Sequence, residues 1–123
     1  MLYMKSTKSI RGPLAEAMRD GDFGPDVRNA AATVVVVLTQ GWCPQWIMMK
    51  RWFEDASGEA AVFHLEYDKE EFFEPFMAWK EDFLGNRSVP YLRYYRDGVL
   101  TGQSNYVSKD AFKAAIRRQA PSQ

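Results

Sequence analysis

Cys43 is the side chain whose type and position most clearly indicate covalent chemistry. It is the only cysteine of the 123-residue chain and comes shortly after four consecutive valines, residues 34–37. The valines predict a buried strand, Gly41 a turn, and Pro44 the first position of a helix, where its missing N–H costs nothing. Cys43 is therefore expected at or near the N-cap of that helix, where the positive end of the helix dipole favours a thiolate. A lone cysteine is more often an inert core residue, but this order of elements predicts a nucleophile.

A second segment, from Ser88 to Val99, predicts a hairpin that begins with a proline. Pro90 comes immediately before residues 91–96, and proline is tolerated at the first residue of a strand but is poor in its middle. Asp97-Gly98 is a typical two-residue hairpin turn. Two antiparallel strands are therefore expected at about 91–96 and 99–104.

Together the two segments resemble the thioredoxin superfamily. That family places a Trp-Cys active-site turn after a central strand and, much later, a cis-proline at the start of an antiparallel hairpin. Trp42-Cys43-Pro44 and Val89-Pro90 match these landmarks, with Cys43 and Pro90 47 residues apart. The resemblance covers roughly residues 30–118 and implies an α/β thioredoxin-like fold, with a central mixed β-sheet of about four strands flanked by helices on both faces. It also implies a cis Val89-Pro90 bond beside Cys43, with the Val89 backbone pairing with an extended client chain.

One departure from the family pattern limits the chemistry. Thioredoxins carry a second cysteine three residues after the first, where this chain has Trp46. An intramolecular disulfide is thus excluded, and monothiol chemistry remains: the Cys43 thiolate could attack a disulfide or a sulfenic acid, forming a mixed disulfide that an external thiol resolves. Cys43 is the expected catalytic residue. The expected substrate-binding residues are Trp42, Pro44, Trp46, Val89 and Pro90.

Two further family positions are changed near the cysteine. The position of the family's buried acid, six residues before the cysteine, is Val37, and the position of a lysine on the next strand is His64. As the only histidine, His64 could act as a proton partner of Cys43, or it could be a hydrogen-bonded or partly exposed strand residue. The glycine that opens the groove beside the cis-proline aligns with Asn105 or Tyr106, whose larger side chains would narrow the groove or change its client.

Three functions fit these residues. The preferred one is a monothiol oxidoreductase that exchanges disulfides through Cys43 and is resolved by an external thiol, such as glutathione or a partner thioredoxin. The alternative is a redox-inactive interaction module, in which Trp42, Trp46 and Pro90 bind a protein segment without chemistry. The third is a sensor whose Cys43 forms an intermolecular disulfide. Glutaredoxins also use Cys-Pro, but the Gly-Gly and acidic pair with which they hold glutathione are missing at residues 102–105.

The rest of the chain predicts one domain, residues 1–123, with its core at about 30–118 and an N-terminal helical extension at about 8–31. A strand is expected at about 61–67 and a last helix at about 109–118, capped by Ser108. The helix after Cys43 is expected to end near Ala56. The side chains with which it would pack on the sheet are Ile47, Met48, Trp52 and Phe53.

An aromatic helix between Phe72 and Phe83 is the remaining unusual feature. Positions 72, 76, 79 and 83 are all aromatic and share one helical face. The stripe could pack on the sheet as ordinary core. Alternatively its surplus, such as Phe73 or Trp79, could form a homodimer surface.

Composition narrows the partners and the setting. Sixteen basic and sixteen acidic residues cancel, so no global field favours nucleic acid or an anionic membrane. No segment has the length of a signal peptide's apolar region or of a membrane span. One cysteine and one histidine make a poor metal site, and no cofactor is expected. A protein client or a low-molecular-weight thiol is the expected partner, and a single cysteine fits a reducing cytoplasm.

Overall fold

A five-stranded β-sheet forms the centre of the molecule, with strand order β1-β3-β2-β4-β5. The structure is a computed structural model that describes residues 2–3, 13–69 and 73–118. The strands are β1 (Leu2–Tyr3), β2 (Thr33–Thr39), β3 (Ala61–Glu66), β4 (Tyr91–Arg96) and β5 (Val99–Ser104). The helices are α1 (Pro13–Asp20), α2 (Pro25–Arg28), α3 (Pro44–Ala56), the 3-10 helix η1 (Tyr67–Lys69), α4 (Phe73–Ala78), the π-helix η2 (Trp79–Phe83) and α5 (Lys109–Arg118). The predicted mixed sheet flanked by helices is therefore confirmed, with the short strand β1 added at its edge.

The valine-rich strand β2 lies in the middle of this sheet. It pairs in parallel with β3 and antiparallel with β4. Residues 34–38 are fully buried because helices cover both faces of the sheet, and the β-branched valines suit such a strand. The carboxyl end of β2 leads through Gly41 to Cys43, so the central strand places the thiol at one end of the sheet.

The hairpin of β4 and β5 has the bounds that the sequence predicts. Its turn residues have positive φ angles, 51° at Asp97 and 83° at Gly98, as a two-residue hairpin turn requires. A Cβ atom added at Gly98 would also collide with the side chain of Asn29. Glycine is thus favoured by the turn, and a larger residue here would also force the Asn29 side chain to move.

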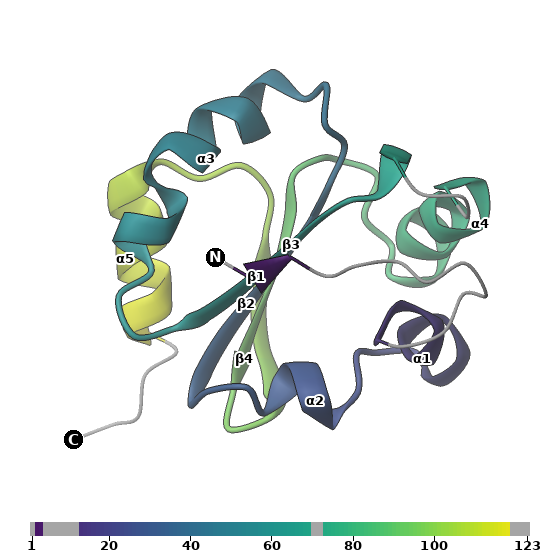
Figure 1. Cartoon of the computed structure of the whole chain (residues 1–123), viewed down its shortest axis with the longest axis horizontal. Coiled ribbons are helices and arrows are strands. Elements are labelled where there is room, and N and C mark those ends of the chain that lie inside the picture. Colours follow the sequence, from purple (N-terminus) through teal and green to yellow (C-terminus); the bar gives the residue numbers. More distant parts are fainter. Residues whose placement is uncertain (1, 4–12, 70–72, 119–123) are drawn as a thin grey trace.

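Helices cover both faces of the sheet (Figure 1). Helices α3 and α5 lie on one face and α1, α2 and α4 on the other, as two layers around the sheet. Alternate residues of β2 point to the two sides: Val35 and Val37 pack in the core under α3 and α5, and Val34 and Val36 in the core under the other helices. In α5 the Ser108 hydroxyl accepts a hydrogen bond from the Ala111 N–H, at 3.2 Å, as an N-cap does.

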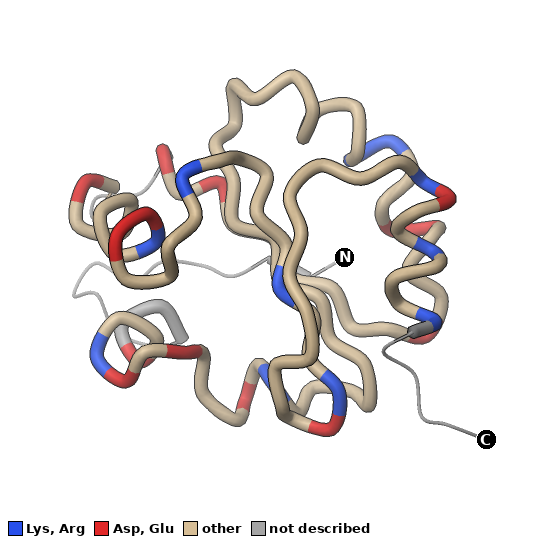
Figure 2. The backbone as a smooth tube through the Cα atoms, turned by 180° about the vertical axis from the view of Figure 1, so that it is seen from behind, with Lys and Arg blue, Asp and Glu red and all other residues tan. Residues whose placement is uncertain are grey.

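Charged residues lie mostly on the helices and connecting segments, while the central strands carry few of them (Figure 2). Basic and acidic residues are interspersed along these outer segments. Among the helices in the described ranges, none is long and apolar enough to cross a membrane.

Candidate thiol site

Cys43 is the N-cap residue of α3, with Pro44 as the first residue of the helix. Its N–H donates to Gln40 O at 3.1 Å, and its carbonyl accepts from the Ile47 N–H at 3.0 Å. The thiol therefore lies at the positive end of a 13-residue helix, as the sequence predicts. The residue is only 3% exposed, so the rate of any reaction at Sγ reports how readily the site opens.

The segment 88–90, named here the proline loop, lies against this thiol. The Val89-Pro90 peptide bond is cis. Cys43 Sγ lies 3.7 Å from Val89 O, within the range of a hydrogen bond donated by the thiol. Pro90 is buried and Val89 half-buried. Cys43 and Val89 are 46 residues apart in the sequence, and the fold brings them into contact beside Pro90.

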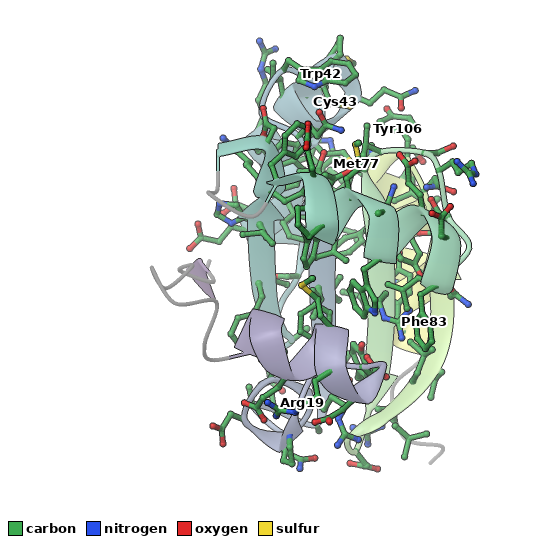
Figure 3. The ribbon with its side chains drawn as sticks, turned by 90° about the vertical axis from the view of Figure 1, so that its right-hand side faces the viewer. Arg19, Trp42, Cys43, Met77, Phe83 and Tyr106 are labelled. Carbon is green, nitrogen blue, oxygen red and sulfur yellow. The ribbon has the colours of Figure 1, made fainter. Side chains whose placement is uncertain are left out.

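Several large apolar side chains are exposed on the first turns of α3 and on the segments next to them in sequence or space. Trp42, Ile47 and Met48 are 62%, 46% and 54% exposed, and Tyr106 is 40% exposed. Figure 3 shows Trp42, Cys43 and Tyr106 toward the same end of the molecule, far from Arg19 at the opposite end. The prediction that Ile47 and Met48 pack on the sheet is wrong, because the helix turns Trp46, Met49 and Phe53 inward instead.

Trp46 requires a correction to the predicted substrate-binding set. Its ring is fully buried, so it fills the core and does not reach the surface around Cys43. The reason is a buried carboxylate: Glu66 Oε2 accepts from Trp46 Nε1 at 2.8 Å and from Lys50 Nζ at 2.9 Å. The side chain that stands where thioredoxins have their second cysteine is thus held inward by a hydrogen bond and by core packing.

His64 lies on β3 directly opposite Val37 of β2 in the strand register. The two positions that match the family's acid and lysine are therefore neighbours in this sheet. The His64 ring packs against Trp46, with ring centroids 5.5 Å apart. Its role as a proton partner of Cys43 stays a prediction.

A polar network that sequence reasoning missed supports the proline loop. Asn105 Nδ2 donates to Pro90 O at 3.1 Å and to Ser88 O at 3.3 Å, and its amide also pairs with that of Asn86. Lys80 Nζ donates to the same Ser88 O at 2.5 Å. Asn105, one of the two residues that align with the family's groove glycine, thus supports the loop. No local pattern in the sequence indicates that Lys80 turns inward.

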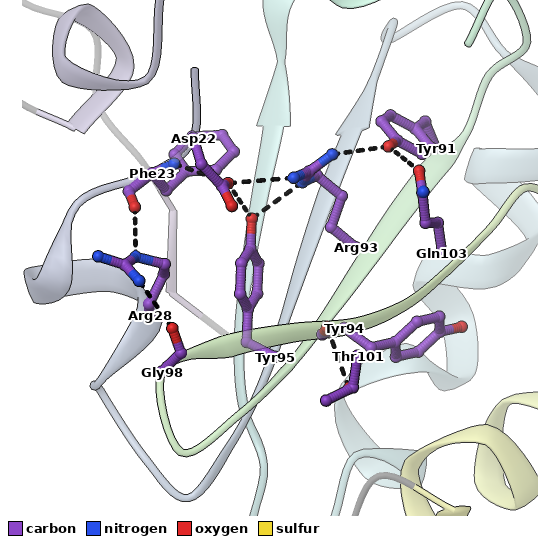
Figure 4. Close-up of polar contacts among 10 residues, drawn as sticks. All are labelled: Asp22, Phe23, Arg28, Tyr91, Arg93, Tyr94, Tyr95, Gly98, Thr101 and Gln103. Carbon is purple, nitrogen blue, oxygen red and sulfur yellow. Dashed lines mark hydrogen bonds and ion pairs between the residues drawn. The ribbon is translucent and has the colours of Figure 1, made fainter. Parts of the chain in front are cut away.

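A second buried network runs along β4 from Tyr91, the residue after Pro90 (Figure 4). Arg93 is 4% exposed and donates to the hydroxyls of Tyr91 and Tyr95, at 2.8 and 2.9 Å. Its Nη2 lies 3.2 Å from Asp22 Oδ1, which also accepts from Tyr95 at 2.5 Å. The Tyr91 hydroxyl in turn donates to Gln103. Burial raises the pKa of Tyr95 well above its usual value, and Arg93 opposes that rise.

The aromatic helix mainly serves the core. Phe76 is fully buried, and Phe73 and Trp79 are half-buried against the core under α1, α2 and α4. Phe83 is 64% exposed and stacks on Trp79, with ring centroids 6.2 Å apart. Phe72 lies outside the described residues. The homodimer through this helix stays a prediction.

The described ranges, 2–3, 13–69 and 73–118, hold no group of three or more His, Cys, Asp or Glu side chains that could bind a metal ion. No protein-family model matches the sequence. No curated protein matches it at a significant level.

Solved structures, in contrast, are similar to this chain over nearly its full length. A mutant thioredoxin from Halobacterium salinarum aligns with a TM-score of 0.67 at 19% identity, covering 99% of this chain and 92% of that one. Thioredoxin O2 from Arabidopsis thaliana, in its oxidized state, aligns with a TM-score of 0.65 at 16% identity, covering 95% and 91%. Thioredoxin F from spinach chloroplast aligns with a TM-score of 0.64 at 19% identity, covering 96% and 91%. Strand order, the position of the thiol and these likenesses together show that the chain has the thioredoxin fold.

Proposed function

We propose that the chain is a monothiol thiol–disulfide exchange protein that uses Cys43. The observation that carries the proposal is the pairing of Cys43, at the N-terminus of α3, with Val89 O of the proline loop at 3.7 Å. Reactive cysteines commonly lie at helix N-termini, and the thiolate is the form of cysteine that attacks disulfides. The exposed side chains of Trp42, Ile47, Met48 and Tyr106 supply an apolar surface on which a client could bind.

The exchange runs in two balanced steps. The Cys43 thiolate attacks one sulfur of a client disulfide, an S–S bond forms, and the other client sulfur leaves as a thiolate with the electron pair of the broken bond. An external thiolate then attacks the client sulfur of this mixed disulfide, forms a disulfide with it, and returns Cys43 as a thiolate. Overall, one external thiolate enters the disulfide and one client thiolate leaves. The buried Trp46, which stands where thioredoxins have a second cysteine, cannot take the place of the external thiolate in the second step.

The partner for the second step is a low-molecular-weight thiol or a protein thiol, and the client is a protein disulfide. A reducing compartment such as the cytoplasm would supply the external thiol.

The requirement for an external thiol gives a direct test. With a protein disulfide as substrate, turnover should be near background with a dithiol-specific reductase alone, because the chain has a single cysteine. Added glutathione should raise the release of client thiol in proportion to the protein, and Cys43→Ser should lose that increase. Turnover without any added monothiol would contradict the proposal. If glutathione does not raise the release of client thiol above the level seen with Cys43→Ser, the redox-inactive interaction module is the function that fits.

A further inference from the structure

Lys80 is a fully buried lysine on the π-helix η2, one of the least favourable positions for a charge in this fold. Its Nζ donates to Ser88 O at 2.5 Å and lies 5.7 Å from the centroid of the Tyr91 ring. Desolvation lowers the pKa of Lys80 to about 8, and nearby Glu81 opposes that shift. The hydrogen bond to Ser88 O connects this ammonium group to the proline loop, which faces Cys43.

The backbone of η2 helps to explain this placement. Leu84 N–H donates to Trp79 O at 3.1 Å, five residues back, which is the wider turn of a π-helix. Glu81 and Asp82, the acidic neighbours of Lys80, are both paired with Arg87, at 3.5 and 2.7 Å. The carboxylates next in sequence thus bind an outer arginine, and Lys80 Nζ is left to the backbone of the proline loop.

The contact with Ser88 is one residue away from the carbonyl that meets the thiol. Val89 O accepts from Cys43 Sγ, and the carbonyls on either side of it, Ser88 O and Pro90 O, are both held by side chains. Asn105 bonds both of them, and Lys80 adds a charged donor, which makes a stronger hydrogen bond than a neutral one. We propose that Lys80 is a positioning residue, which holds the Val89 backbone in the orientation that an extended disulfide client requires.

This inference rests on the proposed function, because it assigns a role in client binding at the same site. A small alkylating agent needs only Cys43, whereas a disulfide-linked peptide also needs the backbone of Val89. Loss of the Lys80 contact should therefore affect the two reactions differently. The ionisable groups that meet Lys80 are Glu81 on its own helix and Tyr91 on β4, whose ring also lies under the Arg93 guanidinium.

The experiment compares Lys80→Met with wild type and with Lys109→Met, an exposed lysine at the start of α5. In Lys80→Met the rate of mixed-disulfide formation with a disulfide-linked peptide should fall about tenfold or more, the loss that one charge-assisted hydrogen bond represents. Alkylation by iodoacetamide reports how readily the buried thiol opens to a small reagent, so the peptide rate divided by the alkylation rate should fall about tenfold. Lys109→Met should change neither rate. Equal changes in both rates, or no change in either, would overturn the positioning role.

A second measurement tests the Lys80 contact even if the variant does not fold or the wild type does not react with the peptide. The ¹³C shift of the Ser88 carbonyl in the wild-type protein should titrate with a midpoint near pH 8, as the ammonium donor becomes an amine. The carbonyl shift of Thr101, which lies on β5, should not follow that titration. A Ser88 carbonyl that shows no such midpoint would overturn the inference. If the shift titrates while the peptide disulfide leaves Cys43 unmodified, the Lys80 contact stands and the proposed exchange function fails.

Discussion

Replacing Asp22 by alanine is expected to lower the free energy of unfolding by about 3 kcal/mol or more, because it leaves a buried cation without its carboxylate. Arg93 is the cation, with a side chain 5% exposed, and Asp22 Oδ1 lies 3.2 Å from its Nη2. Asp22 also accepts the Tyr95 hydroxyl and the Phe23 N–H, at 2.5 and 2.8 Å. Urea denaturation followed by tryptophan fluorescence measures the loss.

Two control variants separate this effect from a general loss of charge. Arg93→Met should cost less than Asp22→Ala, because the side chain of Asp22 is 34% exposed and can be hydrated once its partner is gone. Asp20→Ala removes a carboxylate two residues away, in a pair with Arg19 where both side chains are more than half exposed. Such surface pairs contribute about 1 kcal/mol or less. Equal losses in Asp22→Ala and Asp20→Ala would contradict the assignment of a buried ion pair.

The second large effect is a pH dependence of stability that Lys80→Met should remove. The pKa of Lys80 falls from 10.5 to about 8 on folding. Between these values the unfolded chain binds more protons than the folded one, so this lysine makes stability rise with pH. Over that window the wild type should gain up to about 3 kcal/mol of unfolding free energy relative to Lys80→Met.

Urea denaturation at several pH values from 7 to above 10 would test this, because subtracting the Lys80→Met curve cancels the titration of shared groups. Lys109→Met, which removes an exposed lysine, should follow the wild-type curve throughout. Parallel curves for wild type and Lys80→Met would mean that the buried amine does not lose its proton in this window.

The elements that position the thiol follow from short-range patterns in the sequence. Four consecutive valines predict a central strand, Pro44 the start of a helix, and Asp97-Gly98 the turn of a hairpin, and all three are present. Each pattern depends on the backbone preferences of a few adjacent residues, so a single sequence is enough to identify it.

The side chains that support the site could not be predicted in this way. The inward turn of Trp46 depends on Glu66, twenty residues later, and the burial of Lys80 on the backbone of Ser88. Both contacts pair a polar group with a partner that the tertiary fold supplies. The α3 face shows the same limit, since Ile47 and Met48 have the apolar character of core residues and yet are exposed on the helix.

The most direct test of the thiol assignment is the intact mass of the protein after incubation with oxidised glutathione. One glutathione adduct per chain is expected on Cys43 and should be absent in Cys43→Ser. It should be stable because Trp46 cannot resolve it, and added thiol should remove it. A folded wild-type chain that remains unmodified, and that iodoacetamide also fails to alkylate, would contradict the assignment of Cys43 as a nucleophile.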